Sequence, residues 1–469
     1  MSKEYLMTRL FKAPQGEDDK HAYHTPLETK VKEILSPFQE YIASQITASF
    51  LLLVCTIIAI VWASLPNLSQ WYTALTQLAL GLHLGSIHLV MPLKFWVNDV
   101  LLTLFFFFVG LEIKREFLVG ELTNPKQAVY VIVAAIGGMS IPPLIYLLFN
   151  HDTSTVSGWG IPMATDTAFA LGIMSCFRRL LPKGLFSFMA ALAIIDDIGA
   201  IIVIAVFYTT DLNVVLLLPI LLLVTVLCLM NYAGFRKPWP YLIIGLIIWG
   251  LIESAGIHGT IAGILVAFLI PARPHYGPRR FIRKTRELLD DFENHRTAKP
   301  RVLEDDKQHE VLEEVQQIAQ EATTPLQRWE SRLELPVALV ILPLFALINA
   351  GIALRPSLLP ELLHNSVALG ILLGLLVGKP IGIILFSQLA TWCKFGIPPM
   401  GVSRSHISIA GLLAGVGFTM SLFIANLSFA DHETILLAKA AILFGSLLAA
   451  AIGLISILTF GTKMKPNKQ

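Results

Sequence analysis

Long apolar stretches recur along the chain from residue 46 onward, separated by short polar segments. A helix needs about 20 apolar residues to cross a hydrocarbon core about 30 Å thick. The pattern predicts twelve membrane-spanning helices, at residues 46–65, 96–118, 127–149, 161–177, 185–208, 213–232, 239–254, 258–271, 335–353, 364–389, 403–430 and 434–459. The ranges 239–254 and 258–271 are short, and 161–177 contains Asp166. The expected fold is an all-α polytopic membrane protein.

Lysine and arginine collect in alternate connections between these helices, as they do in the cytoplasmic loops of membrane proteins. The basic connections contain Lys114, Arg115 and Lys126; Arg178, Arg179 and Lys183; Arg236 and Lys237; the loop from Arg273; and Lys394 and Arg404. The intervening connections hold almost none, with Lys94 and Arg355 as exceptions. Both termini are therefore expected in the cytoplasm. The predicted organisation is a cytoplasmic segment 1–45, helices 1–8 in 46–271, a cytoplasmic loop 272–333, helices 9–12 in 334–460 and a tail 461–469.

Two connections stand out. Residues 273–332 hold many charges of both signs and one apolar stripe at helical spacing, formed by Val311, Leu312, Val315 and Ile318. They are either a solvated linker with one marginal helix or an insert that makes regulatory contacts. Residues 80–93 alternate around Gly85-Ser86 and predict a small extracytoplasmic β-hairpin, whose unpaired edges invite a second subunit. No apolar run precedes residue 46, so no cleaved signal peptide is apparent.

Composition agrees with a membrane protein. Apolar residues make up 55% of the chain and charged residues 14%, against about 25% in soluble domains. The 35 basic and 33 acidic residues nearly cancel, which gives no support for a nucleic-acid partner. Four scattered cysteines fit neither a disulfide framework nor a zinc site, and their apolar surroundings predict small buried side chains. They are Cys55, Cys176, Cys228 and Cys393.

Four ionisable residues lie deep within apolar runs: Asp166, Asp196, Asp197 and Lys379. A charge at mid-bilayer costs about 2.5–3.5 kcal/mol on insertion scales, so each requires a reason. Adjacent helical residues point about 100° apart, so Asp196 and Asp197 cannot both face one partner. Lys379 can pair with one of them. A static ion pair that pins two helices leaves the other carboxylate unmatched. Burial lets such a carboxylate hold a proton near neutral pH, and once ionised it suits a small hard cation. Competition of proton and cation for one site is the basis of an ion exchanger.

Two segments carry glycine and proline interruptions beside polar residues. GWGIPMATDTAFALG at 158–172 contains Thr165 and Asp166, and HISIAGLLAGVGFTMSLFIA at 406–425 contains three glycines beside Thr419. Glycines alone are typical of tight helix packing, but with Asp166 in the matching segment we favour broken helices around an ion site. Segments 127–208 and 364–459 are then expected to be inverted three-helix repeats, on hydropathy and charge placement alone.

Together these motifs resemble the NhaA family of bacterial Na+/H+ antiporters, over roughly residues 40 to 460. The matching elements, in order, are VGLEIKRE, ATDTAFALG, ALAIIDDIGA, ILPLFALINAG, GKPIG and GVGFTMSLFIA. The resemblance implies a multi-pass protein of the bacterial inner membrane, with two discontinuous helices crossing at mid-membrane. It implies a pH-regulated, electrogenic exchange of cytoplasmic Na+ or Li+ for a larger number of protons by alternating access, without a cofactor.

The resemblance also implies roles for individual residues. Asp197 is the main Na+ and proton carboxylate, Asp196 is its neighbour paired with Lys379, and Thr165 with Asp166 lies at the helix crossing. The pH-sensing entrance corresponds to Glu112, Glu116 and Glu330, and His258 corresponds to a histidine of the pH response, although a lone histidine at a span end is often structural. The hairpin at 80–93 resembles the family's dimer contact, so a homodimer in the lipid bilayer is expected.

Two features depart from the family: Glu334 replaces a frequent histidine, and the 273–332 loop is longer than in compact members. Both lie in the region to which the resemblance assigns regulation. Among other functions, an intramembrane aspartyl protease needs aspartates on two helices and a GxGD-type motif, which is not present. A sodium-coupled symporter would need further polar groups for its solute, and the spans hold few.

Overall fold

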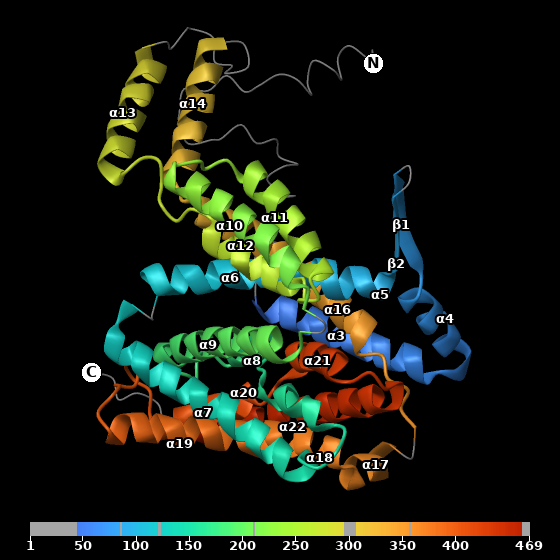
Figure 1. Cartoon of the computed structure of the whole chain (residues 1–469). Coiled ribbons are helices and arrows are strands. Elements are labelled where there is room, and N and C mark those ends of the chain that lie inside the picture. Colours follow the sequence, from blue (N-terminus) through green and yellow to red (C-terminus); the bar gives the residue numbers. More distant parts are fainter. Residues whose placement is uncertain are drawn as a thin grey trace, which may run out of the picture.

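The computed structural model describes residues 45–84, 87–120, 123–209, 212–294, 306–355 and 358–461, and these are almost entirely helical (Figure 1). Within them, eight helical stretches are long and apolar enough to cross a membrane, or nine when one bent pair is counted as a span. The eight are Ile46–Ser64, Leu93–Val119, Pro125–Asn150, Lys183–Phe207, Val214–Tyr232, Pro325–Asn349, Ser366–Trp392 and His432–Phe460. Helices α11 (Pro238–Ser254) and α12 (Thr260–Leu269) are apolar but shorter. The helical fold is confirmed, whereas the number of twelve spans stays a prediction.

Several long stretches are built from consecutive elements. One stretch joins α5 (Leu93–Phe95), the π-helix η1 (Trp96–Leu101) and α6 (Leu102–Val119). A second joins α15 (Pro325–Pro336), η6 (Val337–Ile341) and α16 (Leu342–Asn349), so this helix begins well before the predicted residue 335. A third joins α18 (Ser366–Leu373), η7 (Gly374–Gly378) and α19 (Lys379–Trp392). The uninterrupted helices are α3 (Gln45–Ser64), α7 (Pro125–Asn150), α9 (Lys183–Phe207), α10 (Leu217–Tyr232) and α22 (His432–Gly461).

Both predicted helix breaks are present. The 3-10 helix η3 (Val156–Met163) is followed by extended residues and then by α8 (Thr167–Cys176). Helix α20 (Arg404–Ala414) is separated from α21 (Phe418–Ser428) by Gly415 to Gly417, with a 46° bend. The two breaks touch, since the backbone N–H of Asp166 donates to the carbonyl of Val416 at 2.7 Å. A Cβ on Gly415 would lie 2.5 Å from the Leu375 carbonyl, so only glycine fits this contact.

The two predicted repeats each contain one interrupted element between two long helices. In the first group η3 and α8 follow α7 and precede α9, and in the second α20 and α21 follow α19 and precede α22. Helices α7 and α19, one from each group, pack closely because glycines meet at their contact. A Cβ on Gly137 would lie 2.3 Å from the Gly382 carbonyl. The inverted relation between the groups stays a prediction.

The predicted hairpin is confirmed. Strands β1 (Ala79–Leu84) and β2 (Ile87–Pro92) pair antiparallel, with Ala79 opposite Pro92. The turn residues Gly85 and Ser86 lie outside the described residues. The hairpin follows the short helix α4 (Pro66–Thr76), which sequence reasoning did not predict, and Figure 1 shows the two strands projecting beside it. A role in dimerisation stays a prediction.

Within its described residues the charged connection contains two complete helices and the start of α15, instead of the single helix expected. Helix α14 (Asp306–Ala322) carries the predicted apolar stripe, with Val311 and Ile318 buried. Helix α13 (Pro278–Asn294) packs beside it, and Figure 1 shows the pair extending away from the other helices. The prediction of one marginal helix was therefore wrong, because each helix supplies the other with an apolar face that neither can bury alone. The last short helix is α17 (Leu358–His364). Of the predicted terminal segments 1–45 and 461–469, residues 1–44 and 462–469 lie outside the described residues.

Candidate ion site

A buried ion pair joins two helices at the centre of the site. Lys379, the first residue of α19, places Nζ 2.7 Å from Oδ2 of Asp196, which lies near the middle of α9. The side chains are 0% and 1% exposed. Two charges shielded this completely from water are tolerated only when they pair and hydrogen-bond well. The predicted pairing is thus confirmed.

The extended residues after η3 complete this pair. The Thr165 hydroxyl lies 2.7 Å from Oδ2 of Asp196 and 3.1 Å from the Ala414 carbonyl, so its one proton can serve either acceptor. Lys379 also donates to the Met163 carbonyl. Oδ1 of Asp196 is buried and has no hydrogen-bond partner among the described residues. One carboxylate oxygen therefore accepts from two donors, and the other remains available.

Asp197 faces a cavity of about 340 Å³. Its carboxylate is 8% exposed and has no hydrogen bond or ion pair within the part of the chain that the structure describes. The neighbouring Asp196 does not line this cavity, as expected for adjacent positions on one helix. Exposed residues Ser331 and Glu334 lie at the other end of the lining, so the cavity connects Asp197 to the surface.

Asp166 connects the two broken helices. It is the N-cap residue of α8, where Oδ1 accepts from the backbone N–H of Phe169 at 3.1 Å. Oδ2 accepts from the backbone N–H of Thr419 at 3.1 Å and from its hydroxyl at 2.6 Å, in the first turn of α21. A single carboxylate thus faces the positive ends of two helix dipoles. Thr419 also lines the cavity, although its sequence position predicted no role in the site.

The predicted entrance carboxylates gather around one arginine. Arg115 Nε lies 2.6 Å from Oε1 of Glu330, and Arg115 Nη1 lies 3.9 Å from Oε2 of Glu116. Of the three predicted residues only Glu112 lines the cavity, and Glu334 lines it as well. Arg115 was counted in a basic loop and was missed as a site residue, because a cation at a span end is ordinary.

His258 is placed apart from this cavity. Its Nδ1 lies 3.9 Å from Oδ1 of Asp99, which is within ion-pair range but beyond a hydrogen bond. The imidazole packs edge-on against Phe423, with 5.8 Å between ring centroids. Asp99 lies in η1 near the start of a predicted span, where a carboxylate gives no strong signal, and it was missed.

The chain matches a family model described as Na+/H+ antiporter 1 over residues 39–457. The chain belongs to this family. It is 42% identical over 442 residues to Na(+)/H(+) antiporter NhaA 2 of Psychromonas ingrahamii, covering 94% of this chain and 93% of that protein. It is 43% identical over 438 residues to Na(+)/H(+) antiporter NhaA 1 of Shewanella denitrificans, covering 93% and 97%. The similar protein of Dichelobacter nodosus, Na(+)/H(+) antiporter NhaA, is 41% identical over 430 residues, covering 92% of each.

Membership confirms the resemblance to the NhaA antiporters. Together with the apolar helices it makes the chain a multi-pass membrane protein of the sodium-transport, antiport class. Its relatives are named as antiporters and not as enzymes, in agreement with the expected transporter. The protease and symporter alternatives gain no support from these names.

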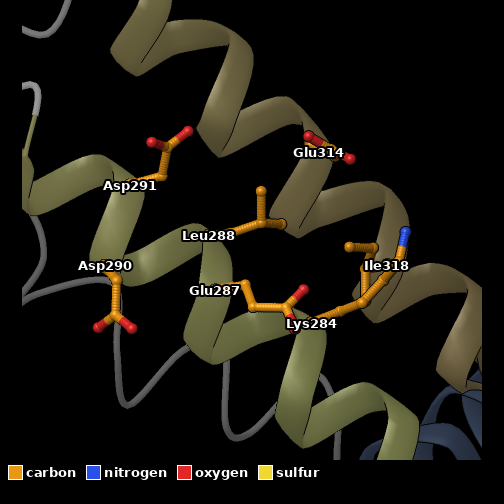
Figure 2. A pocket seen from close by; sticks show the side chains of 7 residues that line it. All are labelled: Lys284, Glu287, Leu288, Asp290, Asp291, Glu314 and Ile318. Atoms are coloured by element: carbon orange, nitrogen blue, oxygen red, sulfur yellow. The ribbon is translucent and has the colours of Figure 1, made fainter.

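A second cavity, of about 400 Å³, lies between the two helices of the charged connection (Figure 2). Its lining consists of Lys284, Glu287, Leu288, Asp290, Asp291, Glu314 and Ile318. Figure 2 shows the carboxylates of Asp290 and Asp291 pointing in different directions. Within the described ranges no group of three or more His, Cys, Asp or Glu is placed to hold a metal ion.

The cysteines correct one expectation. Within the described residues all four are free thiols, but three of them are exposed: Cys176, Cys228 and Cys393. The prediction that they are buried was wrong, because an apolar run in a membrane protein faces lipid as well as the protein interior.

Proposed function

We propose that the chain exchanges cytoplasmic Na+ or Li+ for a larger number of protons by alternating access, with Asp197 as the carboxylate for which cation and proton compete. The observation that carries this proposal is the unequal placement of two adjacent carboxylates. Asp196 is held by Lys379 and Thr165, whereas Asp197 faces the cavity without a partner among the described residues. Only Asp197 is free to change its ligand without first breaking an ion pair.

Ion binding at Asp197 follows from ordinary ligand chemistry. Na+ and Li+ prefer oxygen ligands, which the cavity supplies from carboxylates and hydroxyls. Burial favours the neutral form of a carboxyl group, and a bound cation favours the ionised form. Each cation that binds therefore displaces a proton. No cofactor is needed for this exchange, since the transported ions themselves are the only ligands.

Electrogenic exchange requires a second proton, and Lys379 can supply it. Oδ1 of Asp196 lacks a partner within the described part of the chain, so this carboxylate can turn toward an ion bound at Asp197. The turn removes the counter-charge of Lys379. An ammonium without a counter-charge in a dehydrated site is costly, and releasing its proton relieves that cost. Two protons then leave for each Na+ that enters.

The remaining parts of the proposal concern regulation and assembly. Glu112, which lines the cavity, acts as the pH-sensing group together with Glu116 and Glu330, which pair with Arg115, and His258 is a second element. We further propose that the protein is a homodimer through its hairpin. It is placed in the bacterial inner membrane with both termini in the cytoplasm, in contact with lipid and with no nucleic acid. The 273–332 connection then lies in the cytoplasm, where regulatory contacts can reach it.

The proposal is tested in everted membrane vesicles with an imposed acidic interior. Adding Na+ or Li+ should dissipate the pH gradient, as followed by fluorescence dequenching. Asp197→Asn should abolish the response and Asp196→Asn should reduce it at least tenfold. Asp152→Asn is the matched control, since this aspartate is 85% exposed and should behave as the parent. Normal sodium-dependent dequenching in Asp197→Asn would refute the assignment.

A further inference from the structure

Three asparagines from distant parts of the sequence form a hydrogen-bonded group, called here the amide cluster: Asn98, Asn349 and Asn426. Asn349 is 0% exposed and hydrogen-bonds with both of the others. Its Oδ1 accepts from Nδ2 of Asn98 at 3.2 Å and from Nδ2 of Asn426 at 3.1 Å. Its own Nδ2 donates to Oδ1 of Asn98 at 2.7 Å. The cluster therefore ties η1, α16 and α21 together.

The same three helical stretches line the cavity of the ion site. At about 1.5 Å per helical residue, the cluster lies roughly 21 Å along the η1–α6 stretch from Glu112. It lies roughly 22 Å along the α15–α16 stretch from Glu334 and roughly 10 Å along α21 from Thr419. All three of these reference residues line the cavity. The amide cluster is thus beyond the ion site, on the side opposite the cavity mouth.

Buried phenylalanines lie along the three stretches between the reference residues named above and the cluster. Every stretch has at least one such residue with almost no exposure: Phe106, Phe345 and Phe423 are 0%, 0% and 2% exposed. All three belong to one hydrophobic core, and the rings of Phe106 and Phe423 lie 5.9 Å apart. A hydrated ion cannot cross such a layer while it is closed, because the ion would lose its water without gaining ligands.

We infer that the amide cluster, with this phenylalanine layer, is the closed gate of the transport path on the far side of the ion site. The inference rests on the alternating access proposed above. Amides suit a gate because water can replace their hydrogen bonds when the helices separate. Oδ1 of Asn426 is already buried without a partner in the described residues, so opening the gate hydrates an acceptor that the closed state leaves unsatisfied.

The position of the cluster couples it to the ion site. Thr419 and Asn426 are seven residues apart and lie on one face of α21. Thr419 donates to Asp166 at the ion site, and Asn426 donates to Asn349 at the gate. A displacement of α21 as a unit that releases Asn426 therefore also changes the groups around Asp166. Ion occupancy and gate opening are linked through one rigid helix.

The test measures access to the site from each side and does not depend on exchange. All four native cysteines are replaced by serine, and Met420, which lines the cavity, is replaced by cysteine. Proteoliposomes of sorted orientation are treated with a charged, impermeant methanethiosulfonate reagent on one side at a time. Asn349→Ala should accelerate labelling from the far side at least fivefold, and Asn426→Ala should accelerate it in the same direction.

Asn150→Ala is the matched control. Asn150 is also 0% exposed and donates to the carbonyls of Tyr146 and Ser366, but it lies at the end of α7, outside the three stretches. It should leave far-side labelling unchanged. Unchanged far-side labelling in folded Asn349→Ala would overturn the inference, as would an equal acceleration in Asn150→Ala. If Asn349→Ala does not fold, Asn426→Ala, at a half-buried position, decides by the same criterion. If the parent protein shows no Na+/H+ exchange, the proposed function is refuted, but the labelling result still stands.

Discussion

Asp166 and Thr419 hold the two interrupted helices together through two hydrogen bonds to one carboxylate oxygen. The hydroxyl of Thr419 lies 2.6 Å from Oδ2 and its backbone N–H lies 3.1 Å from the same atom. The other oxygen caps α8. One side chain thereby replaces the turns that both broken helices lack at their N-terminal ends. The crossing is therefore held by side-chain hydrogen bonds, which a segment of glycines alone cannot form.

We expect Asp166→Asn to destabilise this crossing, since an amide offers one acceptor oxygen in place of two and carries no charge for the helix dipoles. Loss of a capping side chain costs about 0.5–2 kcal/mol and loss of a charged hydrogen bond about 1.5–3 kcal/mol. Thermal unfolding in detergent should show a lower midpoint, with exchange reduced at least tenfold. Thr419→Ser keeps both donors and should resemble the parent. Thr419→Val keeps only the backbone donor, so its unfolding midpoint should lie between those of the parent and of Asp166→Asn. A Thr419→Ser protein as defective as Thr419→Val would contradict the role of the hydroxyl.

A double-mutant cycle tests the Asp196–Lys379 pair. Lys379→Met leaves a buried carboxylate without its counter-charge, which costs about 3–5 kcal/mol in other buried pairs. Adding Asp196→Asn removes that charge, so the double variant should regain most of the lost thermal stability. If the loss of thermal stability in the double variant equals the sum of the losses in the two single variants, Asp196 and Lys379 are not coupled.

The same cycle separates stability from charge movement. On a solid-supported membrane, Asp196→Asn with Lys379→Met should give little or no current on a sodium jump, because the second proton carrier has been removed. Any remaining exchange should be electroneutral. A full-sized current in a stable double variant would show that Lys379 has only a structural role.

The buried charges were predictable because apolar surroundings make each one conspicuous. Asp166, Asp196, Asp197 and Lys379 were identified on that ground, and the structure brings three of them into contact with the two helix breaks or with each other. The 100° rotation between adjacent helical residues was enough to predict that Asp196 and Asp197 face different surroundings. These features depend only on local sequence and on the cost of burying charge.

Other features depend on tertiary contacts that the local pattern does not contain. Helices in lipid are apolar on all sides, so periodicity does not show which face meets the protein. For that reason the sequence pattern predicted neither the burial of Asn349 nor the π-helical segments η1, η6 and η7. Arg115 and Asp99 were missed because charged residues near span ends are common. Helix α13 was missed because its partner α14 is needed to bury its apolar face.

A cap outside the membrane-spanning helices predicts a local dependence on pH. The side chain and backbone N–H of Thr434 donate to Oδ2 of Asp431, and these hydrogen bonds lower the pKa of Asp431 below its usual value. A carboxylate with a lowered pKa stabilises the folded state above its unfolded pKa, and this contribution is lost as pH falls through the folded value. Asp431→Ala should therefore speed amide hydrogen exchange in the first turn of α22 at pH ~7. The difference from the parent should shrink as the pH falls through the lowered pKa of Asp431, because the protonated side chain no longer carries the charge that strengthens these hydrogen bonds. A difference that persists undiminished at low pH would contradict this assignment.

Glu334 should act on ion affinity more than on turnover. It lies exposed at the cavity mouth and shares the lining with Glu112 and Asp197. Clustered negative charge in a cleft raises the local concentration of cations, an effect that salt screens. Glu334→Gln should raise the KM for Na+ about two- to fivefold and leave the maximal exchange rate within about twofold of the parent. The KM difference should shrink when choline chloride raises the ionic strength.

Glu310→Gln, at an exposed position on α14 away from the cavity, is the matched control and should keep the parental KM. A lowered maximal rate at unchanged KM would instead place Glu334 in the conformational step, because a carboxylate that only attracts cations cannot slow a saturated transporter.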